Sequence, residues 1–173
     1  MLRAAAGFGR ALDAVMSAPG IVPALRAADA LAHEAGMTTD PGSIASRLAG
    51  TIAQEVDQLA AIAAVHALSA VPGPGAPALL ADLLGDRRWH VSEHASWALS
   101  ARGPYGPAMP TLATMVSEGG FRGMLAQRTL GGWAMGDAPA VHRVVADALQ
   151  IAGGAGARGR LSDTLGLIPG SAV

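Results

Sequence analysis

The sequence contains no cysteine, no lysine and no asparagine, and only 3% of its 173 residues are aromatic. Without cysteine there can be no disulfide, no thiolate nucleophile and no cysteine metal site. Because all twelve basic residues are arginine, catalysis by a lysine side chain is excluded as well. With so few aromatic rings the core must be built from Ala, Leu, Val and Ile, which favours closely packed helices.

Charge is also scarce, since 14% of the residues are charged and the formal net charge is −1. A balance this close to neutral gives no general attraction to nucleic acid or to an anionic membrane. No uncharged apolar run reaches the length of about 18 residues that a membrane span needs. Arg10 and Asp13 interrupt the apolar stretch that a secretory signal would require. We expect a cytoplasmic chain without a membrane partner, with apolar surface left for another protein.

Leucine recurs at a fixed interval along the chain. The segment Ala98–Ala101 repeats Ala67–Ala70 as Ala-Leu-Ser-Ala, and the same step recurs further along the chain. Self-similarity at a period of about 31 residues is typical of stacked repeat proteins. The leucines that share this spacing are Leu68, Leu99, Leu130 and Leu161.

Glycine and proline divide the chain into segments with helical rather than strand-like periodicity. Asp40, Asp86 and Asp137 are predicted helix caps, and Thr51 with Gln54 predicts a capping box for the helix that follows. The helices are expected at residues 2–17, 23–35, 41–50, 52–71, 76–84, 88–101, 107–117, 121–135, 138–151 and 160–167.

Each repeat is expected to contain a first helix, a Gly/Pro turn and an antiparallel second helix that begins with proline. Pro77, Pro110 and Pro139 occupy equivalent places in second helices, and Pro23 resembles an earlier, degenerate copy. We therefore predict an all-α, right-handed α-α superhelix of about five helix pairs in one domain. The parts of that domain, 1–173, are N-terminal capping helices at 1–50, the best-formed repeats at 51–151 and a C-terminal cap at 152–173.

Two segments resemble HEAT-like repeats, in particular the short repeats of phycocyanin-bilin-lyase-type proteins. They are Asp86 followed by Val91–Leu99, and Pro77–Leu84, and the resemblance extends over about residues 52 to 151. It implies a curved scaffold with a binding face, and only rarely catalysis.

The chain departs from that family directly after the valine, where members usually carry arginine. Ser92 stands there, and the neighbouring repeats have Ala61 and Gly123. The Asp–Arg ladder that rigidifies many such solenoids therefore lacks its arginine here. A second, weaker likeness relates Gly119–Trp133 to HEAT-like modules that accompany bacterial glycosyltransferases.

The letters His90-Val-Ser-Glu93-His94 match the inverted zinc-protease motif H-x-x-E-H. On a helix, His90 and His94 share a face and could hold zinc, with Glu93 beside them as a base. The sequence places no convincing third ligand, and most of these letters are those of a HEAT-like first helix. We therefore favour an ordinary polar helix face over a metal site, and predict no cofactor.

The stretch Gly154–Gly159 matches G-x-G-x-x-G, the letters of a dinucleotide-binding fingerprint. That fingerprint needs a preceding strand, and here a helix precedes it. We expect a flexible loop between helices.

Tryptophan and arginine most often anchor interfaces, and both occur together on the expected first helices. Equivalence in the repeat places Trp97 opposite Arg128 on neighbouring helices, with His66 equivalent to Trp97 one repeat earlier. The alternative is that Trp97 and Trp133 are core residues. The predicted binding face comprises Trp89, His90, Glu93, Trp97, Arg122, Arg128 and Trp133.

These features favour a non-catalytic interaction scaffold, or an accessory subunit of a bacterial natural-product or glycosyltransferase system. Its partner would be an enzyme or a second copy of the chain. One alternative is a nucleic-acid-binding repeat protein resembling the alkylpurine DNA glycosylases, which would need a basic surface. The other is a lyase or isomerase of the bilin-lyase type, which would need an aromatic pocket.

Overall fold

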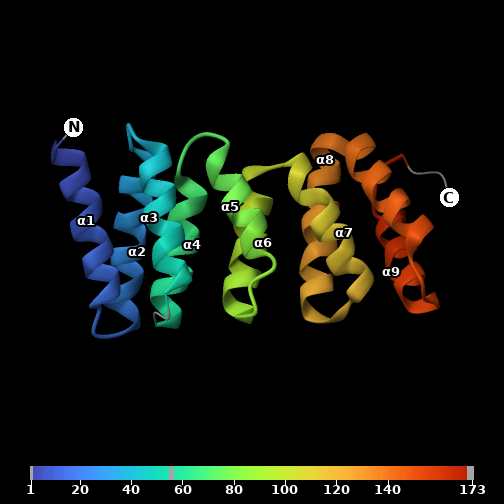
Figure 1. Ribbon diagram of the computed structural model, residues 1–173, viewed down its shortest axis with the longest axis horizontal. Helices are drawn as coiled ribbons and strands as arrows, with labels where there is room; N and C mark the ends of the chain where they lie inside the picture. The colour runs from blue at the N-terminus through green and yellow to red at the C-terminus, as the bar shows by residue number, and fades with distance from the viewer. Residues whose placement is uncertain (1, 55–56, 171–173) are drawn as a thin grey trace. The chain divides into compact units, whose positions relative to one another are not determined.

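The computed structural model describes residues 2–54 and 57–170 (Figure 1). Within those ranges the chain forms nine α-helices and one short 3-10 helix, and it contains no strand. The all-helical prediction is therefore confirmed. The chain divides into two compact units, residues 1–83 and 84–173.

The first unit is built from five helices. They are α1 (Leu2–Met16), α2 (Ile21–Gly36), α3 (Pro41–Ala53), α4 (Gln58–Ala70) and α5 (Gly75–Leu83). Asp40 caps α3 as predicted, because its carboxylate accepts a hydrogen bond of 3.1 Å from the backbone N–H of Ser43.

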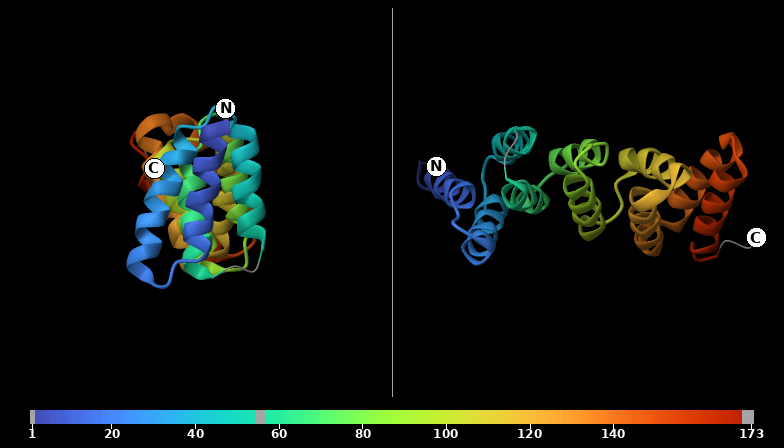
Figure 2. Two further views of the ribbon diagram at one scale, coloured as in Figure 1. Left: turned by 90° about the vertical axis from the view of Figure 1, so that its left-hand side faces the viewer. Right: turned by 90° about the horizontal axis from the view of Figure 1, so that it is seen from below.

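Helix α2 packs against α4, and α3 packs against α5, so the unit has two layers of alternating helices (Figure 2). This places α2 in the same layer as α4. The resemblance of Pro23 to Pro77 predicted instead that this helix would be equivalent to α5, and that prediction is wrong. Pro23 lies in the first turn of α2, where proline is tolerated whichever layer the helix joins.

The second unit contains α6 (Trp89–Arg102), a 3-10 helix (Gly106–Ala108), α7 (Met109–Glu118), α8 (Gly120–Ile151) and α9 (Ala155–Gly166). Helix α8 is sharply bent at Asp137, whose φ of −149° and ψ of 66° are not helical. The Asp137 carboxylate accepts a hydrogen bond of 3.2 Å from the N–H of Ala140. Asp137 therefore caps a new helical segment, as predicted, and α8 has a first half at 120–136 and a second half at 138–151.

Burial follows the repeat seen in the sequence. Each of the four equivalent leucines lies in the core of its own unit with no exposed surface. The second helices of the second unit repeat a pair of buried residues one turn apart, at Leu112 with Val116 and at Val141 with Val145. Equivalent positions thus have equivalent burial, as repeated helix pairs require.

The predicted capping box at Thr51 is wrong. Thr51 lies inside α3, where its hydroxyl donates to the Arg47 carbonyl at 3.0 Å. Any threonine within a helix can form this local hydrogen bond. Asp57 caps α4 instead, accepting 2.9 Å from the Leu59 N–H. Residues 55 and 56, which the predicted helix 52–71 included, lie outside the described residues.

The predicted loop at 154–159 is also wrong beyond Gly154, because α9 begins at Ala155. Two arginines tie this glycine-rich helix to its surroundings. Arg158 donates to the Ala152 carbonyl at 3.1 Å, and Arg160 donates to the Val116 carbonyl at 3.0 Å. Packing of α9 on α7 and α8 outweighs the low helix propensity of glycine.

Two glycines of α8 allow the effect of close helix packing to be distinguished from the effect of helix propensity. A Cβ at Gly123 would lie 2.7 Å from the Met115 carbonyl oxygen, whereas a Cβ at Gly131 would meet nothing within 4 Å. We expect Gly123→Ala to destabilise the second unit by about 1–3 kcal/mol, and Gly131→Ala to stabilise it by about 0.5–1 kcal/mol. Urea unfolding followed by circular dichroism measures both; equal effects of the two substitutions would contradict the close approach of α7 and α8.

Candidate interaction face

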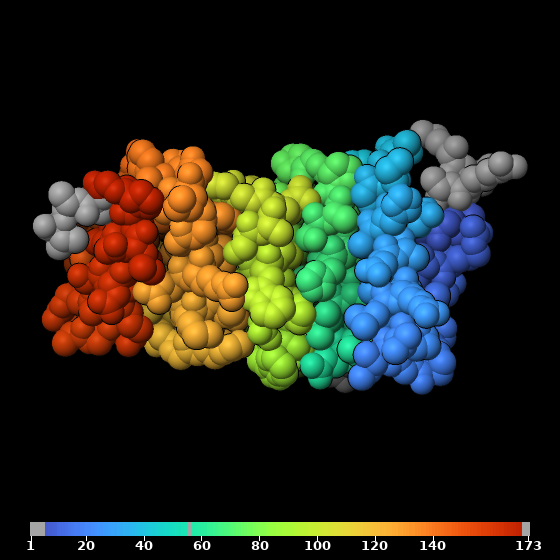
Figure 3. Space-filling model, turned by 180° about the vertical axis from the view of Figure 1, so that it is seen from behind, coloured from blue at the N-terminus to red at the C-terminus, as the bar shows by residue number. Residues whose placement is uncertain are grey.

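Helix α6 and the first half of α8 run parallel, side by side. Three contacts join them, and their residue numbers increase in the same direction along both helices. Arg122 Nε donates to Ser92 Oγ at 3.2 Å, Ser96 and Thr129 share a hydrogen bond of 2.6 Å, and Trp133 Nε1 donates to the Leu99 carbonyl at 3.3 Å. The surfaces of α6 and of the first half of α8, yellow-green and ochre, adjoin in the space-filling view (Figure 3).

A buried hydroxyl network sets the register of the two helices. The Thr129 hydroxyl accepts from Ser100 at 3.1 Å and shares a hydrogen bond of 2.6 Å with the Ser96 hydroxyl, and both it and Ser96 lie within hydrogen-bond distance of the Leu125 carbonyl, at 3.0 and 3.3 Å. Ser96 and Thr129 are each 1% exposed. Because each buried hydroxyl has a partner within the pair, the network stabilises one alignment of α6 against α8.

This register determines which side chains share a surface. Ser96 points toward α8, and Trp97 is rotated from it by about 100° around the helix axis. Thr129 points back toward α6, and Arg128, one residue earlier, is rotated by about 100° in the opposite sense. Since the helices are parallel, Trp97 and Arg128 emerge on the same side and at the same level.

Residues three, four and seven positions away lie on the same side. We call this surface the α6–α8 face. Its large apolar side chains are well exposed, at 42% for Trp97, 48% for Phe121, 54% for Met124 and 80% for Met135. The face comprises His90, Glu93, Trp97 and Ala101 on α6, and Phe121, Met124, Arg128, Gly132 and Met135 on α8.

The two histidines of α6 pack against its tryptophans. The His94 ring lies 4.9 Å from the Trp97 ring, edge to face, and the His90 ring lies 5.8 Å from the Trp89 ring in the same manner. Trp89 is 57% exposed at the start of α6, beside the face. No three His, Cys, Asp or Glu side chains of the described residues are grouped so that they could hold a metal ion.

Two members of the predicted binding face have other roles. Trp133 is 1% exposed, so it belongs to the core and its side chain is not available to a partner. Trp97 is exposed, although it was the other candidate for the core. The difference is the helix face, because Trp133 follows Thr129 by one turn and points toward α6, whereas Trp97 is turned away from the contact.

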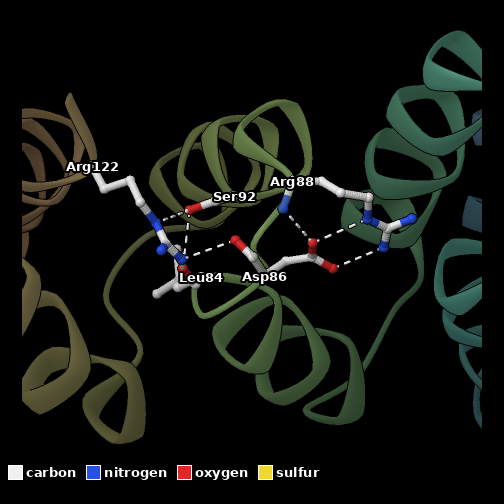
Figure 4. Close-up of polar contacts among 5 residues, drawn as sticks. All are labelled: Leu84, Asp86, Arg88, Ser92 and Arg122. Atoms are coloured by element: carbon white, nitrogen blue, oxygen red, sulfur yellow. Dashed lines mark hydrogen bonds and ion pairs between the residues drawn. The ribbon is translucent and has the colours of Figure 1, made fainter.

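The Arg122 guanidinium also points inward, onto backbone carbonyls of the turn between α5 and α6 (Figure 4). It donates to the carbonyls of Leu84 and, at 3.0 Å, Asp86, while its Nε donates to Ser92 Oγ. Ser92 in turn donates to the Leu84 carbonyl at 3.0 Å. Arg122 and Ser92 together therefore satisfy the carbonyls that follow α5.

Asp86 does not cap α6 through a helical N–H, as the sequence suggested. Its carboxylate accepts from the Arg88 backbone N–H at 2.8 Å and forms an ion pair of 2.8 Å with the Arg88 side chain (Figure 4). The side-chain hydrogen bond from Arg88 lowers the pKa of Asp86. Asp86 and Arg88 thus close the turn that leads into α6.

Arg160 repeats the arrangement of Arg122 one pair later. It donates to the Val116 carbonyl at 3.0 Å and to the Ser117 carbonyl, at the end of α7. Nothing in the sequence marked this residue as a functional or structural contact, because its first acceptor is 44 residues away. In the second unit, arginine-to-carbonyl bonds therefore join α8 to the turn before α6, and α9 to the end of α7.

A groove of about 460 Å³ lies between α7 and the second half of α8, away from the α6–α8 face. It is open and mostly apolar. Its lining is Pro110, Ala113, Thr114, Val144, Asp147, Ala148, Gln150 and Ile151. No motif in the sequence marks it, since its lining combines single residues from two separate helices.

The chain matches no protein-family model, and no curated protein matches it. In the part of the chain that the structure describes, no helix combines the length and apolarity needed to cross a membrane.

The contacts of Arg122 predict a stability effect. We expect Arg122→Ala to destabilise the second unit by about 1–3 kcal/mol, because buried acceptors lose their donors. Arg128→Ala, on the exposed side of the same helix, should change the stability of the dilute protein by less than about 0.5 kcal/mol. Urea unfolding of both variants measures the difference, and equal stabilities would rule out the proposed role of Arg122.

Partial burial lowers the pKa of His66, on α4. As the pH falls, the unfolded chain therefore binds this proton before the folded chain does, and the first unit loses stability below the ordinary histidine pKa. An NMR titration of the His66 ring should give a lower pKa in the folded protein than in urea. His66→Gln should reduce the loss of stability on acidification, and an unchanged acid profile would contradict the assignment.

Proposed function

We propose that the chain is a non-catalytic protein-interaction module, a scaffold or accessory subunit, that binds a protein through the α6–α8 face. The observation that carries this proposal is the exposure of Trp97, Phe121 and Met124 together on two helices held in register. Contiguous apolar surface of this kind marks interaction sites in soluble proteins. Aromatic residues, methionine and arginine are the types enriched at protein interfaces, and Arg128 completes the set.

The chemistry of the face favours a protein over nucleic acid. Affinity for nucleic acid depends on several cations that contact phosphates. Arg128 is the only arginine on the α6–α8 face, which also carries Glu93. Arg122 and Arg160 donate to backbone carbonyls of the chain itself, and Arg88 is paired with Asp86.

Binding of a small molecule by a lyase or isomerase has less support. Such sites are usually concave and enclose most of the ligand. The α6–α8 face is formed by the outer sides of two helices, and the groove beside α7 has no aromatic lining.

The wider architecture belongs to the same proposal. The equivalent burial of the four spaced leucines supports HEAT-like repeats, which we propose form a right-handed superhelix. We propose a cytoplasmic location and, as a partner class, an enzyme of a bacterial natural-product or glycosyltransferase system, or a second copy of the chain.

Site-directed photo-crosslinking in the native host tests the function. A benzophenone amino acid at Phe121 is expected to capture a discrete protein band in good yield, because the side chain would lie within an interface. The matched control is the same amino acid at Leu167, which is 58% exposed beyond the end of α9. The proposal would be contradicted if the amino acid at Phe121 labelled no more strongly than the one at Leu167, or if it formed crosslinks to nucleic acid alone.

A further inference from the structure

The α6–α8 face places chemically unlike residues at equivalent positions of its two helices. The repeat pairs Trp97 with Arg128 at one level. It pairs His90 with Phe121 two turns below, and Ala101 with Gly132 one turn above. A surface with complementary residues at equivalent positions can bind a copy of itself.

A two-fold axis parallel to the helices would lay α6 of one chain over α8 of the other. Each level of α6 then meets its own equivalent, so Trp97 faces Arg128 of the second copy, and this contact occurs twice. Guanidinium groups stack favourably on tryptophan rings, and more so once water is excluded. No like charges oppose one another in this arrangement.

The same axis brings small residues together. Ala101 would lie against Gly132 of the second copy, and a Cβ at Gly132 would meet nothing within 4 Å in its own chain. Glycine in the interior of a helix costs stability, and no packing within the chain requires it here. Contact between these two residues lets the backbones of α6 and α8 approach closely across the interface.

The exposed apolar area of the face is a substantial part of what a stable dimer needs. Trp97, Phe121, Met124 and Met135 are between 42% and 80% exposed. Taking about 200 Å² for each free side chain of this size, they offer about 450 Å², more than half of the roughly 800 Å² per partner in a standard interface. The polar residues of the face supply a rim.

We propose that the partner on the α6–α8 face is a second copy of this chain, bound as a two-fold dimer in which Trp97 of each copy stacks on Arg128 of the other. This inference rests on the proposed function, because it identifies the occupant of the same face.

Sedimentation equilibrium of the full chain over a wide concentration range tests the dimer. The wild type is expected to show a monomer–dimer equilibrium, and Trp97→Ala and Arg128→Ala are each expected to raise the dissociation constant at least about tenfold. Arg143→Ala, an exposed arginine on the second half of α8, is the matched control and should leave the constant unchanged.

Mixing the two variants shows whether the pair forms between chains. A heterodimer of Trp97→Ala with Arg128→Ala retains one intact Trp97–Arg128 contact, whereas each homodimer retains none. The mixture should therefore associate more tightly than either variant alone. A contact within one chain could not produce that gain.

Three results would overturn the dimer: a wild-type chain that is monomeric at every soluble concentration, an association that neither variant weakens, or a mixture no tighter than its components. The crosslinking test separates this failure from failure of the proposed function. Capture of a different protein at Phe121 would reject the dimer and keep the interaction function, and absence of any specific capture would reject both.

Discussion

The hydrogen bonds among Ser96, Ser100, Thr129 and the Leu125 carbonyl are the constraint on which the candidate face depends. Buried hydroxyl groups are costly unless they are paired, so the network opposes sliding of α6 along α8. A shift of one residue would turn Trp97 and Arg128 to different sides, since each residue is rotated by about 100° from the last. A small polar network within an apolar core thus determines the composition of an outer surface.

The role of each arginine in the second unit depends on its position along its helix. Arg122, in the first turn of α8, reaches back to the carbonyls that follow α5, and Arg160, in the middle of α9, reaches back to those at the end of α7. Those carbonyls lie at or beyond the C-terminal end of a helix, so the guanidinium supplies donors that the helix itself does not. Arg128, further along the helix from Arg122, is left to the surface. The arginine that satisfies backbone carbonyls and the exposed arginine of the candidate face are therefore different residues of the same helix.

The sequence predicted some residues of the candidate face and not others, for physical reasons. The repeat spacing correctly identified Trp97 and Arg128 as equivalent positions on neighbouring helices, because repeats preserve helix phase. It did not show that Trp133, close to them in the sequence, would be 1% exposed. Nor did it show that Arg122 would bond to Leu84 and Asp86, which lie far back in the sequence. Such contacts depend on how separate helices pack, which composition does not reveal.

The sequence by itself determined the helical class, the repeat and the buried leucines, because glycine and proline positions and apolar spacing act locally. It determined the caps at Asp40 and Asp137 for the same reason. Only the tertiary structure decided that residues 155–159 are helical, that α2 shares a layer with α4, and which tryptophan is exposed. Packing against distant helices outweighs local preference at those places, because burial and long-range hydrogen bonds contribute more free energy than the conformational preference of a single glycine or proline.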